Sequence, residues 1–445
     1  MRTVPKPARI LAAAAVAVTM TACVGRPAPV QATAITAFGT DIPGTPAGGQ
    51  LRWLLDAAPR APIPASELGE HFTADFLKNI PADQLNQVLA VFKDMKLVRL
   101  TQQQDRSLVA RIAVGTLPYD LSLTVDGTGR ISGLRFQSPT PRSWAELDER
   151  LGKAAPRTGL LTAEPAKDGT CRPLHAVAAG KARPLGSMFK LYVLGAVAER
   201  IKSGAFGWDT QLTITPELKS LPSGELQDRP DNSKVTVLEA AKLMISISDN
   251  TATDLLVHKA GRAAVERTMR AWGAADERNV PSLTTRELFV LKGADYPKHA
   301  KRYLSLSDGR QRAYLKSVVA KVPLSQVKAW TAPRELDTIE WFASPAQICR
   351  AYTGLVKLGD KRIAEAMSIN DAGLGLDKGT WPEVWFKGGS EPGLIDMSFL
   401  ARTAGGKTYV TTVMAVNPKT PFADPHATTE LLSLARGAFT LAGDS

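Results

Sequence analysis

The sequence contains little cysteine and little histidine for its length. Only three cysteines and five histidines occur in 445 residues. No CxxC pair and no HxH or HExxH spacing is present, so the usual ligand patterns of a zinc site are missing. Three cysteines are also too few for a disulfide scaffold. We therefore expect no metal site, and no motif indicates another cofactor.

Blocks of like charge are also missing. The formal net charge is +12, from 55 basic and 43 acidic residues spread along the chain, and aromatic residues make up only 6%. Without basic clusters interleaved with aromatic residues, a nucleic-acid partner is disfavoured. The diffuse positive balance fits an anionic membrane or cell wall better. The length is enough for two or three globular domains.

The longest apolar run lies near the N-terminus, at residues 10–20, after Arg2, Lys6 and Arg9. It is too short for a membrane-spanning helix, which needs about 20 residues, and is typical of a secretory signal. The run ends in Met-Thr-Ala-Cys23, which resembles a bacterial lipobox. This resemblance implies lipidation at Cys23, with residues 1–22 as the signal peptide. We expect residues 23–50 to follow as a flexible Pro- and Gly-rich tether, and the exported protein to be anchored by its lipid to the outer face of the bacterial cell membrane.

Residues 51–140 change pattern from helix to strand. Apolar residues at helical spacing predict helices over 66–76 and 82–95, and alternating stretches predict strands over 97–101, 108–114, 119–125 and 131–136. Helices followed by an antiparallel meander indicate an α+β domain, similar to the ketosteroid-isomerase/NTF2-like family. His71 and Asp120 do not form a convincing acid–base pair. We interpret them as a packed or exposed histidine and a surface carboxylate.

Residues 141–156 read as a helical connector, and the second domain, residues 157–445, carries the chemical motifs. The first motif is Ser187-Met-Phe-Lys190, at the start of a helix that is apolar almost all round. A lysine in a buried helix is costly unless its pKa is depressed, and a neutral lysine can activate a neighbouring hydroxyl. The pattern alone is weak, because Ser325 and Lys328 form a second SxxK.

Two further motifs follow in order. Ser248-Asp249-Asn250 lies between two apolar helices, where it either exposes a hydroxyl and an amide or caps the second helix. Lys387-Gly-Gly-Ser390 ends an aromatic-rich strand, whose glycines allow a ligand close to the backbone. A Gly-Lys-Thr sequence near residue 407 lacks the first glycine of a phosphate loop, and we interpret it as a hairpin turn.

Together these motifs resemble the SxxK, SDN and KTG boxes of serine β-lactamases and penicillin-binding proteins, in particular LpqF-type actinobacterial lipoproteins and related clavulanic-acid-cluster proteins. The resemblance implies a class A β-lactamase-like α/β domain, with an antiparallel sheet flanked by helices. It also assigns a role to each site residue: Ser187 is the nucleophile, Lys190 its base, Ser248 a proton relay, Asn250 a ligand of the substrate amide, and Lys387, Gly388, Gly389 and Ser390 the carboxylate- and oxyanion-binding strand.

The chain departs from that family in two places. KGGS replaces KTG, and no ExxLN glutamate, which drives deacylation in class A enzymes, follows the SDN box. Glu287 is a substitute candidate, although we prefer to interpret it as a helix cap with Thr284, and Glu340 is a weaker candidate. We therefore predict an exported serine acyl hydrolase of β-lactam, ester or cell-wall-derived substrates with slow β-lactam turnover. The alternative is a non-catalytic binding lipoprotein. The pairing of Cys171 with Cys349 stays open.

Overall fold

The computed structural model describes residues 40–166, 168–422 and 426–443. Within them, one compact unit ends at Thr140 and a second begins at Pro141. The expected signal peptide and Cys23 lie outside the described residues. No helix in the described ranges is long and apolar enough to cross a membrane.

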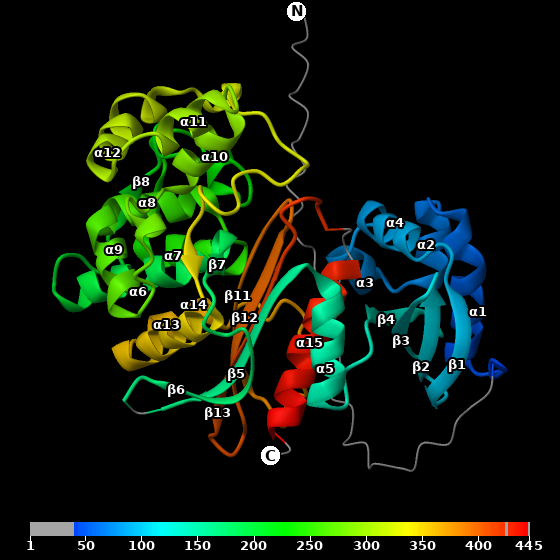
Figure 1. The fold of residues 1–445 in the computed structure, drawn as a ribbon. Coiled ribbons are helices and arrows are strands. Elements are labelled where there is room, and N and C mark those ends of the chain that lie inside the picture. The colour runs from blue at the N-terminus through cyan, green and yellow to red at the C-terminus, as the bar shows by residue number, and fades with distance from the viewer. Residues whose placement is uncertain (1–39, 167, 423–425, 444–445) are drawn as a thin grey trace, which may run out of the picture. The chain divides into compact units, whose positions relative to one another are not determined.

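The first unit consists of helices followed by a four-stranded antiparallel meander in the order β1-β2-β3-β4 (Figure 1). Its elements are α1 (Pro46–Ala57), η1 (Ala58–Arg60), α2 (Ala65–His71), α3 (Ala74–Asn79), α4 (Ala82–Val91), β1 (Lys96–Gln103), β2 (Ser107–Val114), β3 (Leu117–Val125) and β4 (Ile131–Gln137). This succession agrees with the predicted α+β pattern. Three details differ: α1 begins inside the expected tether, the first predicted helix is divided at Phe72, and the helix predicted over 82–95 ends at Val91.

Both residues considered for acid–base chemistry in this unit have structural partners. The His71 ring stacks on Trp53 with centroids 3.8 Å apart, and its Nδ1 lies 2.9 Å from Gln50 Oε1. Asp120 pairs with Arg111 across two strands at 2.6 Å. These contacts agree with the interpretation of a packed histidine and a surface carboxylate.

The second unit is built on a five-stranded antiparallel sheet in the order β11-β12-β13-β5-β6. Its strands are β5 (Arg157–Pro165), β6 (Cys171–Val177), β11 (Glu383–Glu391), β12 (Leu394–Arg402) and β13 (Thr408–Val416), with short pairs formed by β7 (Arg183–Pro184), β10 (Phe342–Ala343), β8 (Gln211–Thr213) and β9 (Lys234–Thr236). The hairpin between β12 and β13 contains the Gly-Lys-Thr sequence, as predicted for a turn.

Helices cover both faces of this sheet (Figure 1). Helices α5 (Trp144–Ala154) and α15 (His426–Gly443) pack together on one face. The other helices are α6 (Lys190–Lys202), α7 (Val237–Ser246), α8 (Asn250–Ala260), α9 (Arg262–Ala271), α10 (Thr285–Gly293), α11 (Lys298–Leu304), α12 (Asp308–Ser317), α13 (Pro345–Leu358) and α14 (Lys361–Met367), with the 3-10 turns η2 (Gly186–Phe189), η3 (Leu226–Asp228), η4 (Glu277–Asn279), η5 (Val319–Lys321) and η6 (Leu324–Gln326).

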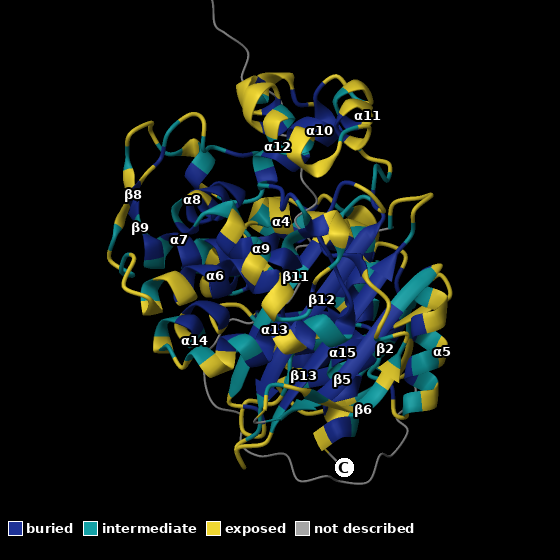
Figure 2. Ribbon diagram, turned by 60° about the vertical axis from the view of Figure 1, so that its left-hand side comes forward, coloured by how far each residue is buried: buried dark blue, intermediate teal, exposed yellow. Residues whose placement is uncertain are grey.

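The burial of apolar side chains explains why helices cover the sheet of the second unit. Strand β12 is buried along all but its last residue (Figure 2). The sheet to which it belongs has helices on both faces (Figure 1). In α6, every residue from Lys190 to Ala198 is buried, which agrees with the predicted central helix. At about 25 cal/mol per Å² of apolar surface, such burial is the main stabilising contribution to the domain. The buried helix α6 therefore holds the residues at its N-terminus in a fixed position.

A disulfide joins Cys171 at the start of β6 to Cys349 in α13, with Cα atoms 6.4 Å apart. The pairing that the sequence left open is therefore made in the structure. It ties an outer strand of the sheet to a helix 178 residues later in the chain, which restricts the unfolded state.

Candidate active site

Ser187 lies in the turn η2, directly before α6. It is partly exposed, whereas the neighbouring residues Gly186 and Met188 are buried. The turn requires a glycine at 186, because the backbone there has φ +47°. A β-carbon on Gly186 would also lie 3.1 Å from Ser390 N. The local sequence therefore leaves the Ser187 hydroxyl accessible and brings the turn against β11.

Lys190 is fully buried, and all its described hydrogen bonds are to uncharged groups. Its Nζ donates to Ser248 O at 2.6 Å and to Asn250 Oδ1 at 2.7 Å, and lies 3.0 Å from Ser248 Oγ. Burial, followed by repulsion from Lys387, holds the pKa of Lys190 well below its usual range. A lowered pKa favours the neutral form of the lysine, which is the form that can accept a proton from a hydroxyl.

The SDN turn is strained and fixed by several partners. Ser248 has φ +57°, an unusual value for a residue other than glycine, and its carbonyl also accepts a hydrogen bond from Ser223 Oγ at 2.6 Å. Asp249 caps α8 through Ala252 N at 2.7 Å. The aspartate therefore caps the helix, as one interpretation of the motif expected. The Asn250 amide is buried instead of exposed, and both Ser248 and Asn250 contact Lys190.

Asn250 is oriented by two contacts of its own side chain. Its Oδ1 accepts from Lys190, and its Nδ2 donates to Leu221 O at 2.9 Å. The amide cannot flip without losing both contacts, so its orientation follows from the network.

Lys387, on strand β11 of the sheet, also contacts Ser248. Its Nζ lies 3.1 Å from Ser248 Oγ and donates to Gly388 O at 2.8 Å. Burial lowers the pKa of Lys387 to about 7. The hydroxyl of Ser248 thus connects two lysines, one from α6 and one from β11, and can pass a proton between the base and a leaving group.

Strand β11 approaches the nucleophile turn very closely. A β-carbon on Gly389 would lie 2.0 Å from Leu185 O and 2.8 Å from Ser187 N. The backbone N–H groups of Ser187 and Ser390 are therefore on adjoining segments, as required of two donors to one oxyanion. The hydroxyl of Ser390 lies on the exposed side of the strand.

Neither candidate for the deacylating glutamate is beside Lys190. Glu287 forms the predicted capping box with Thr284 and an ion pair with Arg262 at 2.6 Å. Glu340 is buried against Lys292 at 2.9 Å. Ser325 and Lys328, which form the second SxxK pattern, are both exposed. That pattern therefore has no buried lysine to act as a base.

Sequence reasoning missed Lys292 and Glu391, and it considered Glu340 only as a weaker candidate for the deacylating glutamate. Lys292, Glu340 and Glu391 form a buried cluster. A signal for Lys292 was present, because it follows the apolar run Leu-Phe-Val-Leu, which is the same anomaly that identified Lys190. For Glu391 the signal was its position directly after Ser390.

Residues 147–312 match the model of the β-lactamase enzyme family. This match agrees with the serine-hydrolase class expected from the sequence motifs. Residues 42–131 match a model described as the N-terminal part of the ORF 12 gene product, and the expected ketosteroid-isomerase/NTF2-like fold of this region stays a prediction. No curated protein matches the chain.

Several solved structures are similar to this chain. A β-lactamase from Sphaerobacter thermophilus is 18% identical over 68% of this chain and 98% of its own, with a TM-score of 0.47. The protein PBP-A is 19% identical over 69% of this chain and 100% of its own, with a TM-score of 0.45. A β-lactamase from Burkholderia vietnamiensis is 18% identical over 68% and 98%, with a TM-score of 0.47.

Proposed function

We propose that this protein is an exported serine acyl hydrolase that is acylated at Ser187 and releases β-lactam products slowly. The observation that carries the proposal is the shared contact of Lys190 and Lys387 with Ser248 Oγ, next to the nucleophile turn. Lipid anchoring at Cys23 and membership in the LpqF-type subgroup rest on the sequence motifs alone.

In this proposal, acylation uses Ser187, Lys190, Ser248 and the backbone N–H groups of Ser187 and Ser390. Ser187 Oγ attacks the carbonyl carbon while its proton passes to neutral Lys190, and the carbonyl oxygen becomes an oxyanion that accepts hydrogen bonds from two backbone N–H groups. When the tetrahedral intermediate collapses, the scissile C–N or C–O bond breaks. The proton returns through Ser248 Oγ to the leaving nitrogen or oxygen, so the base is regenerated.

Lys387 and Asn250 select the substrate in this proposal. A protonated Lys387 attracts a substrate carboxylate, which Ser390 Oγ assists by a hydrogen bond, and Asn250 binds the side-chain amide. β-Lactams and cell-wall peptides carry both groups. Simple activated esters lack them and are expected to react through the nucleophile and the oxyanion site alone.

Deacylation lacks an assigned base. Water must be activated beside the ester, yet the described contacts of Lys190 Nζ include no carboxylate, and Glu287 is engaged by Arg262 and its capping box. We therefore expect a long-lived penicilloyl-enzyme, with turnover far below the median enzyme kcat of about 10 s⁻¹. Activated esters should turn over faster, because the smaller acyl group leaves room for water.

Intact-mass analysis of the purified protein tests this proposal. Incubation with a penicillin should add one acyl group, and the adduct should be absent in Ser187→Ala and Lys190→Ala. The matched control is Lys328→Ala in the exposed SxxK, which should acylate like the unmodified protein. Equal effects of the two lysine substitutions would contradict the choice of Ser187. Steady-state penicillin hydrolysis at tens per second, abolished by Glu287→Gln, would contradict slow turnover.

A further inference from the structure

Behind the site, one lysine is buried between two glutamates. Lys292 Nζ lies 2.9 Å from Glu340 Oε1 and 2.7 Å from Glu391 Oε1, and the three side chains are 0%, 1% and 10% exposed. Burial alone would lower the pKa of Lys292, but the two carboxyl groups outweigh it and raise the pKa. Burial, together with repulsion from Glu340, raises the pKa of Glu391 well above its usual range. The burial of Glu391 therefore favours its protonated form, while Lys292 stays in contact with both carboxyl groups.

This cluster contacts both backbone segments of the proposed oxyanion site. Glu340 Oε2 accepts a hydrogen bond from the N–H of Gly186 at 3.2 Å, and Gly186 directly precedes the nucleophile. Glu391 directly follows Ser390 on β11. Lys292, from α10, bridges the two glutamates, so one ammonium group links the turn η2 to the end of β11.

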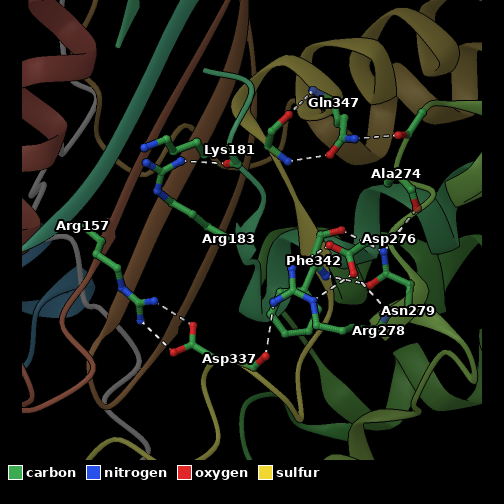
Figure 3. A network of polar contacts seen from close by, with 12 residues as sticks. Arg157, Lys181, Arg183, Ala274, Asp276, Arg278, Asn279, Asp337, Phe342 and Gln347 are labelled. Atoms are coloured by element: carbon green, nitrogen blue, oxygen red, sulfur yellow. Dashed lines mark hydrogen bonds and ion pairs between the residues drawn. The ribbon is translucent and has the colours of Figure 1, made fainter. Parts of the chain in front are cut away.

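The segment that carries Glu340 is fixed on both sides, as Figure 3 shows for its neighbours. On one side, Asp337 Oδ1 pairs with Arg157 at 2.8 Å and its carbonyl accepts from Arg278 at 3.2 Å. On the other, Phe342 exchanges two hydrogen bonds with Asn279, each at 2.8 Å. The Arg278 guanidinium also stacks 3.7 Å from the Phe342 ring centroid. Glu340 therefore has a fixed backbone from which to hold Gly186.

We propose that Lys292, Glu340 and Glu391 are a positioning triad that keeps the N–H groups of Ser187 and Ser390 aligned for the oxyanion. The proposal rests on the proposed function, because it assumes acylation at Ser187. None of the three is placed against the substrate; they act through the two backbone segments that they hold.

The physical reason is the strict geometry of an oxyanion site. Donors stabilise the transition state only when they lie about 2.7–3.1 Å from the developing charge, and loss of one donor costs about 10²–10³ in kcat. A carboxylate that holds Gly186 N–H sets the direction of the adjacent peptide unit. Loss of that acceptor is expected to change the chemical step more than ground-state binding.

Steady-state kinetics with a p-nitrophenyl ester test the triad. Lys292→Met and Glu340→Gln should lower kcat by about 10- to 100-fold and change KM less than about threefold. The matched control is Glu287→Gln, which breaks the ion pair with Arg262 at the other end of the same helix and should leave kcat unchanged.

A double variant separates positioning from folding. Lys292→Met alone leaves Glu340 buried without its cation and is expected to lower the melting temperature. Lys292→Met/Glu340→Gln removes both charges, so the melting temperature should recover while kcat stays low, since Gly186 N–H now faces an unanchored amide. Joint recovery of stability and kcat would overturn the proposal, because the triad would then contribute only to stability.

Hydrogen exchange gives a readout that does not depend on acylation. Backbone amides in peptides covering residues 185–190 and 387–391 should exchange faster in Lys292→Met than in the unmodified protein, with α9 unchanged. Absence of any adduct on the unmodified protein would refute the proposed function. Unchanged exchange together with unchanged kcat in folded Lys292→Met and Glu340→Gln would refute the triad and leave the proposed function standing.

Discussion

Lys387 titrates at a pH where most lysines are fully charged. Burial lowers its pKa to about 7, so its ammonium is lost as the pH rises through neutrality. The pKa of Lys190 also lies well below its usual range, and the same rise in pH favours its neutral, basic form. The two roles therefore have opposite pH dependence. Binding of an anion by Lys387 is strongest at low pH, whereas proton acceptance by Lys190 is strongest at high pH.

We expect this difference to separate charged from neutral substrates. Above pH 7, the acylation efficiency kcat/KM for a penicillin, which bears a carboxylate, should fall by up to tenfold per pH unit as protonated Lys387 disappears. A neutral p-nitrophenyl ester should show a much smaller fall. Stopped-flow acylation rates between pH 6 and pH 9.5 measure both profiles. Superimposable profiles would show that Lys387 does not bind the substrate carboxylate.

At the scale of elements, the site depends on the contact between strand β11 and the turn η2. Gly389 is the position where the two backbones are closest, and any side chain there would overlap Leu185 O. Because a carbonyl in a buried turn cannot move freely, the strand itself would have to shift.

Gly389→Ala should therefore abolish detectable acylation, with a loss of at least about 100-fold, while the protein stays folded. The strand shift separates the N–H groups of Ser187 and Ser390, which removes the oxyanion site. The matched control is Gly406→Ala in the exposed β12–β13 turn, where a β-carbon has no neighbour within 4 Å, although its φ of +84° costs some stability. Circular dichroism and adduct mass measure both effects. Normal acylation of Gly389→Ala would contradict the proposed oxyanion site.

At the scale of the whole molecule, the location of the protein rests on its first 23 residues. If the sequence ending in Cys23 is a lipobox, globomycin should cause unprocessed precursor to accumulate. Cys23→Ala should abolish lipidation and release the protein from the membrane fraction, as labelling with a fatty acid and fractionation would measure. A Cys23→Ala protein that matures and stays membrane-bound as before would contradict the lipoprotein hypothesis.

The sequence alone was enough to identify the order of the three boxes, because each depends on short-range chemistry. A lysine in an apolar helix, a capped turn between helices and a glycine pair after an aromatic strand are visible within a few residues. The α+β pattern of the first unit and the β12–β13 hairpin were predictable for the same reason: both follow from local periodicity and turn residues.

The tertiary structure decided what depends on residues far apart in the chain. Only folding brings Lys387 within 3.1 Å of Ser248, 139 residues earlier, and only folding pairs Cys171 with Cys349. It also separated the two SxxK patterns, since burial makes Lys190 a base and exposure leaves Lys328 an ordinary surface charge. Glu340 shows the limit most clearly: its sequence neighbours gave no sign that its carboxylate would hold the N–H of Gly186, because a hydrogen bond across 154 residues leaves no local pattern.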